Sequence, residues 1–260
     1  MPPASAHASL RLQKSRRLRG GTVREALVTM APPSRSPQRS ELITVGKLSA
    51  DAWRAHDSAI GDCVLTILGP AELARRQRAL RQLDHPRTRR EVGTVTVPNR
   101  GLGLLTTYLP GLPLSERDRR RTLSHPREAL RIGEDVLDVL AHAHRRGVAH
   151  GHLAMRHVIV MSDASGVVGF GQAPAAASVQ GDLRALAALL DELFTDAPGD
   201  EQSVSASRLH SDLGPELDDW LAALADSESG FRSAEHAQSA LRVVSGGLPA
   251  PARRVEQAWF

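Results

Sequence analysis

The chain has 260 residues, of which 41% are hydrophobic and 24% are charged, a size that suits one large domain or two smaller units. Its single cysteine, Cys63, excludes a disulfide framework and is compatible with a reducing compartment. No stretch approaches the roughly 18 apolar residues of a membrane span, and no secretory signal pattern is present, so we expect a cytoplasmic protein without a membrane-spanning segment.

Basic charge is concentrated at the start of the chain. Residues 1–40 contain eight basic side chains and one acidic side chain, whereas the remaining residues contain 25 basic and 28 acidic side chains. This tail is rich in Pro, Ser and Gly and has no sustained apolar period, which predicts disorder. We favour a solvated tail or a start at Met30. An electrostatic arm for nucleic acid or acidic lipid and an Arg-rich transit peptide are the alternatives.

Short strands are expected to follow the tail. Apolar and β-branched residues predict strands at Ile43–Gly46, Ala52–Asp57 and Cys63–Leu68, and a further strand that begins at Leu104. The residues Pro98–Gly101 combine Pro, Asn and Gly, which predicts a turn between two strands.

Helical spacing of apolar residues begins after these first strands. The range Ala71–Leu83 carries three leucines on one face, and Ser233 is a suitable N-cap for the last helix. Further helices are expected at Pro126–Arg146, Asp182–Phe194, Pro215–Ala225 and Ser233–Val244. A polar loop at Thr195–Ser211 separates them, and the chain ends in a linker with Trp259 and Phe260. We expect these two aromatic residues to dock into a groove on this domain or on a partner.

Two short motifs lie near the middle of the chain, His150–Val160 and Gly169-Phe170-Gly171. Their apolar residues resemble the catalytic core of bacterial serine/threonine protein kinases of the Hanks type, in which His-Arg-Asp-Leu-Lys-Pro-x-Asn precedes Asp-Phe-Gly. Asp182 resembles the buried Asp that opens the family's central helix, and Arg232 resembles its late structural Arg. The resemblance spans residues 41–245.

Other residues stand at the positions of the family's catalytic groups. The resemblance implies that the lysine of the third strand, its partner Glu, the catalytic Asp, the metal-binding Asn and the metal-binding Asp are replaced by Thr66, Arg76, His152, His157 and Gly169, respectively. The loop between the first two strands also lacks the glycines that let backbone N–H groups approach phosphates.

Residues that only support the family's fold are kept. The resemblance places His150, Phe170 and Leu80 in an apolar column that joins the two lobes. Only ten residues separate Gly171 from Asp182, so the activation segment is truncated and Arg232 lacks its family partner. Packing has been kept where catalytic chemistry has been dropped.

The implied architecture is an α+β, two-lobed protein-kinase-like fold. We expect a disordered basic tail at 1–40, an N-lobe of antiparallel sheet plus one helix at 41–109, a mainly helical C-lobe at 110–245, and a C-terminal linker at 246–260. A vestigial nucleotide cleft would be lined by Val64, Thr106, Thr107 and Leu109.

The implied function is that of a pseudokinase, a catalytically inactive regulatory or scaffolding module without a cofactor. Its partners would be proteins, such as a true kinase or that kinase's substrate. Adenine stacking and hinge hydrogen bonds do not need Mg²⁺, so metal-independent ATP binding is a secondary possibility.

Three alternative functions are weighed against this interpretation. An unorthodox serine/threonine kinase would use Lys47 and a His base, but a relocated cation does not restore the missing metal ligands. A nucleic-acid-binding protein would depend on residues 1–40 alone. A metal site at His150, His152 and His157 lacks a fourth ligand.

Overall fold

The computed structural model describes residues 42–97, 99–117, 126–172, 177–195, 205–210 and 213–247. It also gives the backbone of two short paired strands, β1 (Leu10–Arg11) and β2 (Leu27–Val28). The expected disorder of the basic tail and the expected docking of Trp259 and Phe260 lie outside the described residues.

The chain divides into two compact units, each described here by itself. A small unit comprises Met1–Gly111 and Val167–Pro174, and a helical unit comprises Leu112–Gly166 and Ala175–Phe260.

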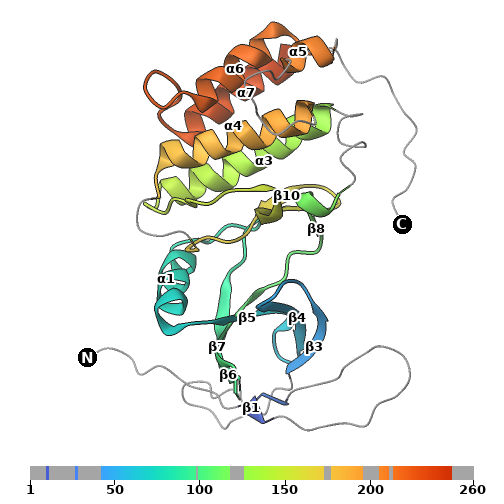
Figure 1. The fold of residues 1–260 in the computed structure, drawn as a ribbon, viewed down its shortest axis with the longest axis vertical. Helices are drawn as coiled ribbons and strands as arrows, with labels where there is room; N and C mark the ends of the chain where they lie inside the picture. The colour runs from blue at the N-terminus through green and yellow to red at the C-terminus, as the bar shows by residue number, and fades with distance from the viewer. Residues whose placement is uncertain are drawn as a thin grey trace. The chain divides into compact units, whose positions relative to one another are not determined.

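A five-stranded antiparallel sheet forms the small unit (Figure 1). Its strands are β3 (Leu42–Lys47), β4 (Ala52–Asp57), β5 (Gly61–Leu68), β6 (Glu91–Val97) and β7 (Gly101–Thr107), in the order β3-β4-β5-β7-β6. The turn before β7 places Asn99 at φ 62° and Gly101 at φ 102°, conformations that Asn and Gly tolerate best. The predicted strands and the predicted turn are therefore confirmed.

Side chains alternate between the two faces of this sheet. One face forms an apolar core from residues of all five strands: Leu42, Ala55, Cys63, Leu65, Leu105 and Val95. The other face carries Val64 opposite Thr106 and Thr66 opposite Leu104 on paired strands. Of the positions that resemble a nucleotide cleft, Val64 and Thr106 therefore lie on the second face, whereas Thr107 pairs with Cys63 of the core face.

The helix α1 (Pro70–Arg81) packs against β6 and β7. It begins with Pro at its first turn, where a missing N–H costs nothing, and it buries Leu73 and Leu80. The segment at Val167 returns to the small unit, because the backbone N–H of Val167 donates to the carbonyl of Arg87 at 2.9 Å.

Gly171 in this returning segment lies directly against α1. Its φ is 75°, and a Cβ atom there would lie 2.8 Å from the Cα atom of Arg76. Arg75 Nε also donates a hydrogen bond to the Gly171 carbonyl at 3.0 Å. Only glycine fits both the backbone conformation and the close approach.

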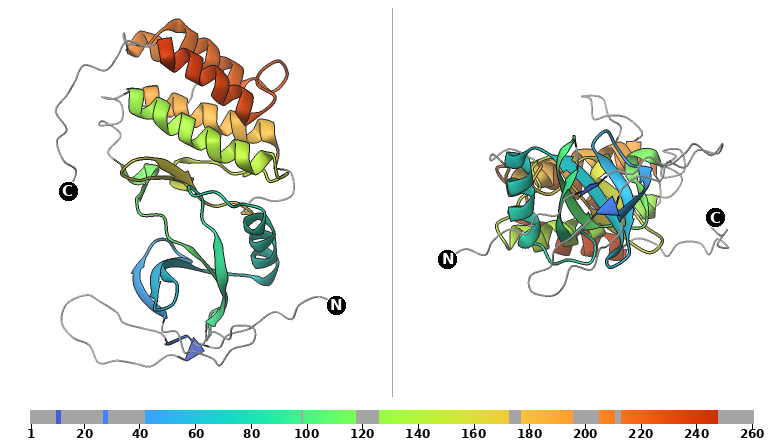
Figure 2. Two further views of the ribbon diagram at one scale, coloured as in Figure 1. Left: turned by 180° about the vertical axis from the view of Figure 1, so that it is seen from behind. Right: turned by 90° about the horizontal axis from the view of Figure 1, so that it is seen from below.

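The helical unit contains α3 (Pro126–His144), α4 (Val179–Thr195), α6 (Pro215–Ala225) and α7 (Ala234–Gly247). Figures 1 and 2 show α3 and α4 side by side as one layer and α6 and α7 as a second layer. A short helix, α5 (Ala206–Leu209), lies within the range predicted as a polar loop. The long helices agree with the predicted ranges to within a few residues at each end.

Small elements complete the helical unit. The strands β8 (Leu112–Pro113), β9 (Val158–Val160) and β10 (Ser165–Val167) form a sheet in the order β10-β9-β8, and Val167 already belongs to the small unit. Two 3-10 turns, η1 (Leu114–Glu116) and η2 (Met155–His157), flank it. In the parts of the chain that the structure describes, no helix is both long and apolar enough to cross a bilayer.

Candidate functional site

Asp182 holds the loop that carries the first motif. Its carboxylate is fully buried near the start of α4 and accepts hydrogen bonds from the backbone N–H groups of His150 (2.7 Å) and Gly151 (2.6 Å). His144 Nε2 donates to the same carboxylate at 2.9 Å. Gly151 has φ 72°, which turns its N–H inward and suits glycine. The structure thus brings together Asp182 and His150, two of the residues expected to support the fold.

Three histidines cluster beyond this loop. The ring of His157 lies 5.1 Å from that of His150 and 5.6 Å from that of His152, measured between centroids. Burial, and to a smaller extent the charges of His150, Arg156 and His152, lower the pKa of His157 to about 4. At neutral pH His157 is therefore an uncharged imidazole, and its buried Nδ1 has no hydrogen-bond partner among the described residues.

His152 stands at the position of the family's catalytic base, but its basic nitrogen is occupied. The Arg156 guanidinium donates to His152 Nε2 at 3.0 Å. A general base needs a free lone pair within reach of the substrate proton. Within the described residues, no group of three or more His, Cys, Asp or Glu side chains is arranged to hold a metal ion.

The second motif also lacks a carboxylate. Gly169 has φ 98°, a left-handed conformation that favours glycine. Phe170 is buried, as is Leu80 on α1, and both belong to the small unit. His150 is buried in the helical unit, so the expected column of these three residues stays a prediction.

On the small unit, the charges expected around a nucleotide are rearranged. Arg76 on α1 donates to Glu72 at 2.6 Å, one turn earlier on the same helix. Thr66 is half-buried on β5 and brings no charge. Lys47 is exposed at the end of β3. The ion pair between a strand lysine and a helix glutamate is thus replaced by a pair within one helix.

The residues expected to line a nucleotide cleft are mostly buried, and one of them forms hydrogen bonds within the small unit. Val64 and Thr106 are buried opposite each other, and Leu109 is also buried. The N–H of Thr107 donates to the carbonyl of Arg90 at 2.9 Å, and the hydroxyl oxygen of Thr107 accepts from the N–H of Arg90 at 3.0 Å.

The turn before β4 is closed on itself. The N–H groups of Leu48 and Ser49 both donate to the carbonyl of Ala52, at 2.9 and 3.1 Å. These two N–H groups therefore point into the turn, whereas a phosphate-binding loop presents its N–H groups to the ligand.

Sequence reasoning missed a set of arginines around Tyr108. The Arg54 guanidinium lies 4.5 Å from the centroid of the Tyr108 ring and pairs with Asp62 at 2.5 Å. Arg89, immediately before β6, is the second member. The run of arginines after His85-Pro86 was the available signal, but it did not show which of them turns inward.

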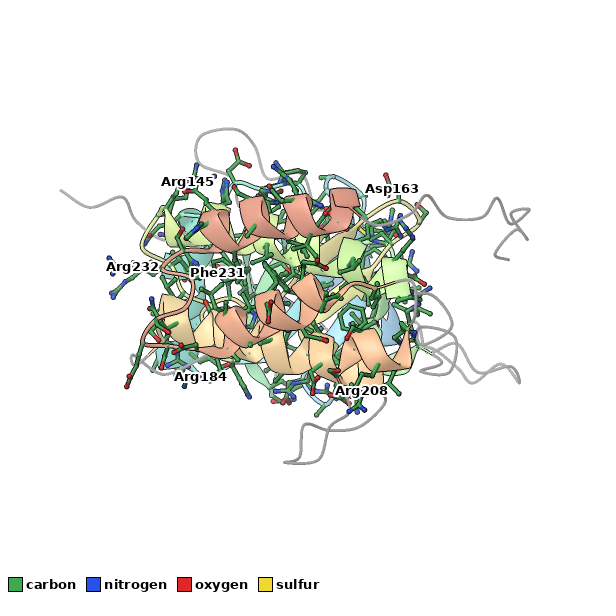
Figure 3. All side chains as sticks on the ribbon, turned by 90° about the horizontal axis from the view of Figure 1, so that it is seen from above. Arg145, Asp163, Arg184, Arg208, Phe231 and Arg232 are labelled. Carbon is green, nitrogen blue, oxygen red and sulfur yellow. The ribbon has the colours of Figure 1, made fainter. Side chains whose placement is uncertain are left out.

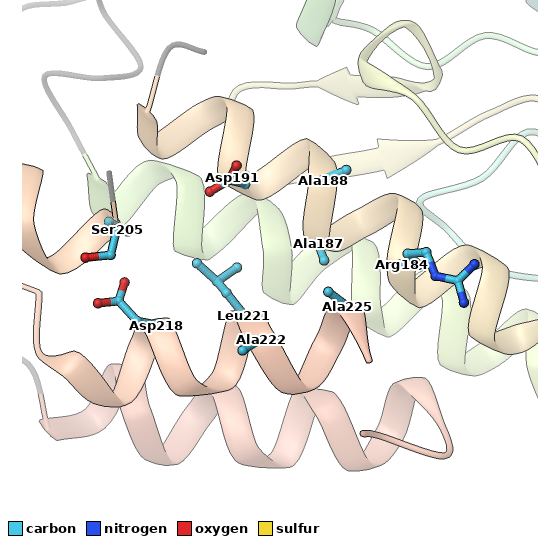
Figure 4. A pocket seen from close by; sticks show the side chains of 10 residues that line it. Arg184, Ala187, Ala188, Asp191, Ser205, Asp218, Leu221, Ala222 and Ala225 are labelled. Carbon is cyan, nitrogen blue, oxygen red and sulfur yellow. The ribbon is translucent and has the colours of Figure 1, made fainter. Parts of the chain in front are cut away.

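The helical unit contains a groove between α4, α5 and α6 that the sequence did not predict. It encloses about 380 Å³ over an apolar floor formed mainly by alanines. Figure 4 shows Asp191 and Asp218 at the end near Ser205, with Arg184 toward the other end. Asp218 accepts from the Ser207 N–H at 3.2 Å, and burial raises the pKa of Asp191. The groove thus combines an apolar floor with two carboxylates and the Ser205 hydroxyl.

Arg232 is exposed between α6 and α7. Figure 3 shows it extending outward from the edge of the helical unit. Its neighbour Phe231 packs instead, with its ring 6.1 Å from that of Trp220 and 5.2 Å from that of His236.

No protein-family model matches the chain, and no curated protein matches it. Many solved structures match it, among them a crystal structure of the kinase domain of PknI from Mycobacterium tuberculosis, in a mutant form. That domain has 22% sequence identity to this chain, the match covers 79% of this chain and 96% of that domain, and the TM-score is 0.62. The antiparallel sheet with its helix and the helical unit therefore form a protein-kinase-like fold.

Proposed function

We propose that the chain is a pseudokinase, a kinase-like regulatory or scaffolding module that acts through protein–protein contacts and does not transfer phosphate. The observation that carries this proposal is the contrast within one loop. Asp182 still holds the loop backbone, whereas the position of the catalytic base is a histidine whose lone pair receives a hydrogen bond from Arg156.

The replaced residues correspond to groups with several different roles in phosphoryl transfer. Phosphoryl transfer needs metal ions that bridge the phosphates, a cation on them and a group that accepts the hydroxyl proton. Here Gly169 and His157 correspond to the metal ligands, Thr66 to the cation and His152 to the proton acceptor. Removal of one preorganised electrostatic group costs about 10²–10³ in rate. Such losses do not multiply simply, but any two of them suffice to suppress turnover.

Protein partners fit this role better than a small substrate does. The groove between α4, α5 and α6 is apolar on its floor and acidic at one end, which suits a peptide segment with basic residues. An active kinase or that kinase's substrate is the partner class that a kinase-like module would recruit in the cytoplasm.

The test is a radiolabelled phosphotransfer assay on the full chain, beside a thermal-shift titration with ATP in the presence and absence of Mg²⁺. We expect no incorporation of phosphate and no magnesium-dependent shift. The variants Lys47→Ala and His152→Ala are the matched controls, because a kinase of unorthodox mechanism would need one or both.

Incorporation that either variant abolishes would overturn the proposal and support the unorthodox kinase. Binding to nucleic acid that disappears on deletion of residues 1–40 would instead support a nucleic-acid-binding protein. Both outcomes can be measured without knowing the protein partner.

A further inference from the structure

Arg89 lies at the edge of the small unit's sheet, where β6 begins and β7 ends. The strands pair with Glu91 opposite Thr106. The Thr107 N–H donates to the Arg90 carbonyl, and the Arg90 N–H donates to the Thr107 hydroxyl. The helix α1, which carries Arg76, packs against both strands. Arg89 therefore sits among β6, the end of β7 and α1.

The guanidinium of Arg89 is enclosed by protein on its inner side. Its Nε is completely buried and has no hydrogen-bond partner among the described residues, while the residue as a whole keeps partial access to water. Burial lowers the pKa of Arg89 to about 10; Tyr108 opposes this shift, and the charge of Arg76 adds to it. The side chain remains a cation at neutral pH, enclosed yet reachable from solution.

Three carboxylates of the small unit are engaged by other side chains. Glu91 accepts from Gln77 and Arg81, and Glu72 pairs with Arg76. Asp62 pairs with Arg54 and His56.

Two further carboxylates of the small unit also have partners. Asp84 lies 3.9 Å from Arg90, and Asp57 accepts from two backbone N–H groups. The described residues of the small unit contain ten basic and six acidic side chains. Within that part of the chain, no carboxylate pairs with Arg89, and positive charge is in excess.

We propose that Arg89 forms an oxyanion-binding site in the small unit that takes a phosphate or carboxylate group. A buried charge without a partner costs several kcal/mol, so a fold that retains one gains stability when an anion binds there. The planar guanidinium offers several donors in a fork that matches phosphate and carboxylate oxygens.

This site does not need a metal ion and is independent of the proposed loss of phosphotransfer. The Arg54 guanidinium over Tyr108 adds positive potential at the same edge. A ligand with an anionic group would therefore be recognised by charge and by the guanidinium fork.

The experiment uses the full chain and three probes at constant ionic strength: pyrophosphate, citrate and ATP without Mg²⁺, with adenosine and sodium chloride as uncharged and simple-salt controls. Binding is measured by calorimetry and by thermal shift. We expect at least one of the three anions to raise the melting temperature, and adenosine to have no effect.

Two variants locate the site. Arg89→Met should weaken the Kd by at least about tenfold, because it removes charge-assisted hydrogen bonds. The matched control is Arg90→Met, since the neighbouring Arg90 is largely exposed and lies 3.9 Å from Asp84, and it should leave the Kd unchanged within about twofold. Arg89→Lys is the second variant, because it keeps the charge and removes the fork.

The outcomes separate the possible sources of the anion. A preference for pyrophosphate and ATP over citrate identifies a phosphoryl ligand, and the reverse identifies a carboxylate. No binding by any anion would overturn the proposal. Binding by Arg89→Met and Arg89→Lys that is as strong as binding by the wild type would also overturn it. Phosphotransfer activity would overturn the proposed function alone, so the two failures are distinguishable.

Discussion

Two buried charges, one in each unit, have opposite surroundings. The Asp182 carboxylate in the helical unit accepts hydrogen bonds from two backbone N–H groups and from His144. The Arg89 guanidinium in the small unit has a buried Nε without a partner. A charge with all its hydrogen bonds made holds its surroundings in place, whereas a charge without them costs free energy until something binds. The first arrangement therefore indicates a structural role and the second a binding role.

The largest effect is expected from Asp182→Ala, which should destabilise the protein by about 3–5 kcal/mol, because two buried backbone donors and His144 lose their acceptor. Urea unfolding measures this loss. Asp219→Ala is the matched control on an exposed position of α6 and should change stability by less than about 0.5 kcal/mol. Equal effects of the two substitutions would contradict the structural role assigned to Asp182.

The buried imidazole of His157 in the helical unit should make the stability of the protein depend on pH. Its folded pKa of about 4 lies below the ordinary value of 6.5, so between these values the unfolded chain binds the proton and the folded protein does not. Stability from this group is complete above pH 6.5 and falls as the pH drops toward 4. Between pH 7 and pH 5 the loss should be about 2 kcal/mol.

The measurement is urea unfolding at both pH values for the wild type and for His157→Leu, which removes the titrating ring. The variant should lose less stability on acidification than the wild type by about that amount. His236→Leu replaces an exposed ring and serves as the control. An acid response that is identical in His157→Leu and the wild type would show that His157 is not the group responsible.

Much of this fold could be predicted because each element has a local signal. Alternation of apolar residues located the strands, and leucines at helical spacing located α1 and α4. Pro215 and Ser233 marked helix starts by their position. The loop at His150 was predictable because its glycine and Asp182 recur at fixed positions in the resembled family.

The arginine arrangement could not be predicted in the same way. Arg87, Arg89 and Arg90 are adjacent in sequence and have the same chemistry, and only the path of the chain into β6 decides which one turns inward. The groove between α4 and α6 likewise depends on small residues that face each other across two helices. Both features arise from tertiary packing, which no single-sequence period encodes.

Cys63 provides the finest test, because it reports on the core of the small unit alone. Its side chain is fully buried, and burial raises its pKa to about 11, with the carboxylates of Asp57 and Asp62 adding to the shift. Since the thiolate is the reactive form, labelling by a disulfide reagent at pH 8 should be at least about 100-fold slower in the native protein than in denaturant. Labelling at the denatured rate would show that this core is open.

The labelling rate of Cys63 also tests whether an anion binds at Arg89 in the small unit. An anion that binds only the folded small unit reduces opening in proportion to its saturation, so at about ten times its Kd the native labelling rate should fall by about tenfold. This protection should vanish in Arg89→Met and persist in Arg90→Met, because the second substitution leaves the enclosed guanidinium in place. In His157→Leu the anion should protect Cys63 as in the wild type, since that residue belongs to the helical unit. Protection that is kept in Arg89→Met would show that the anion does not bind at Arg89 and would remove the binding role from this comparison.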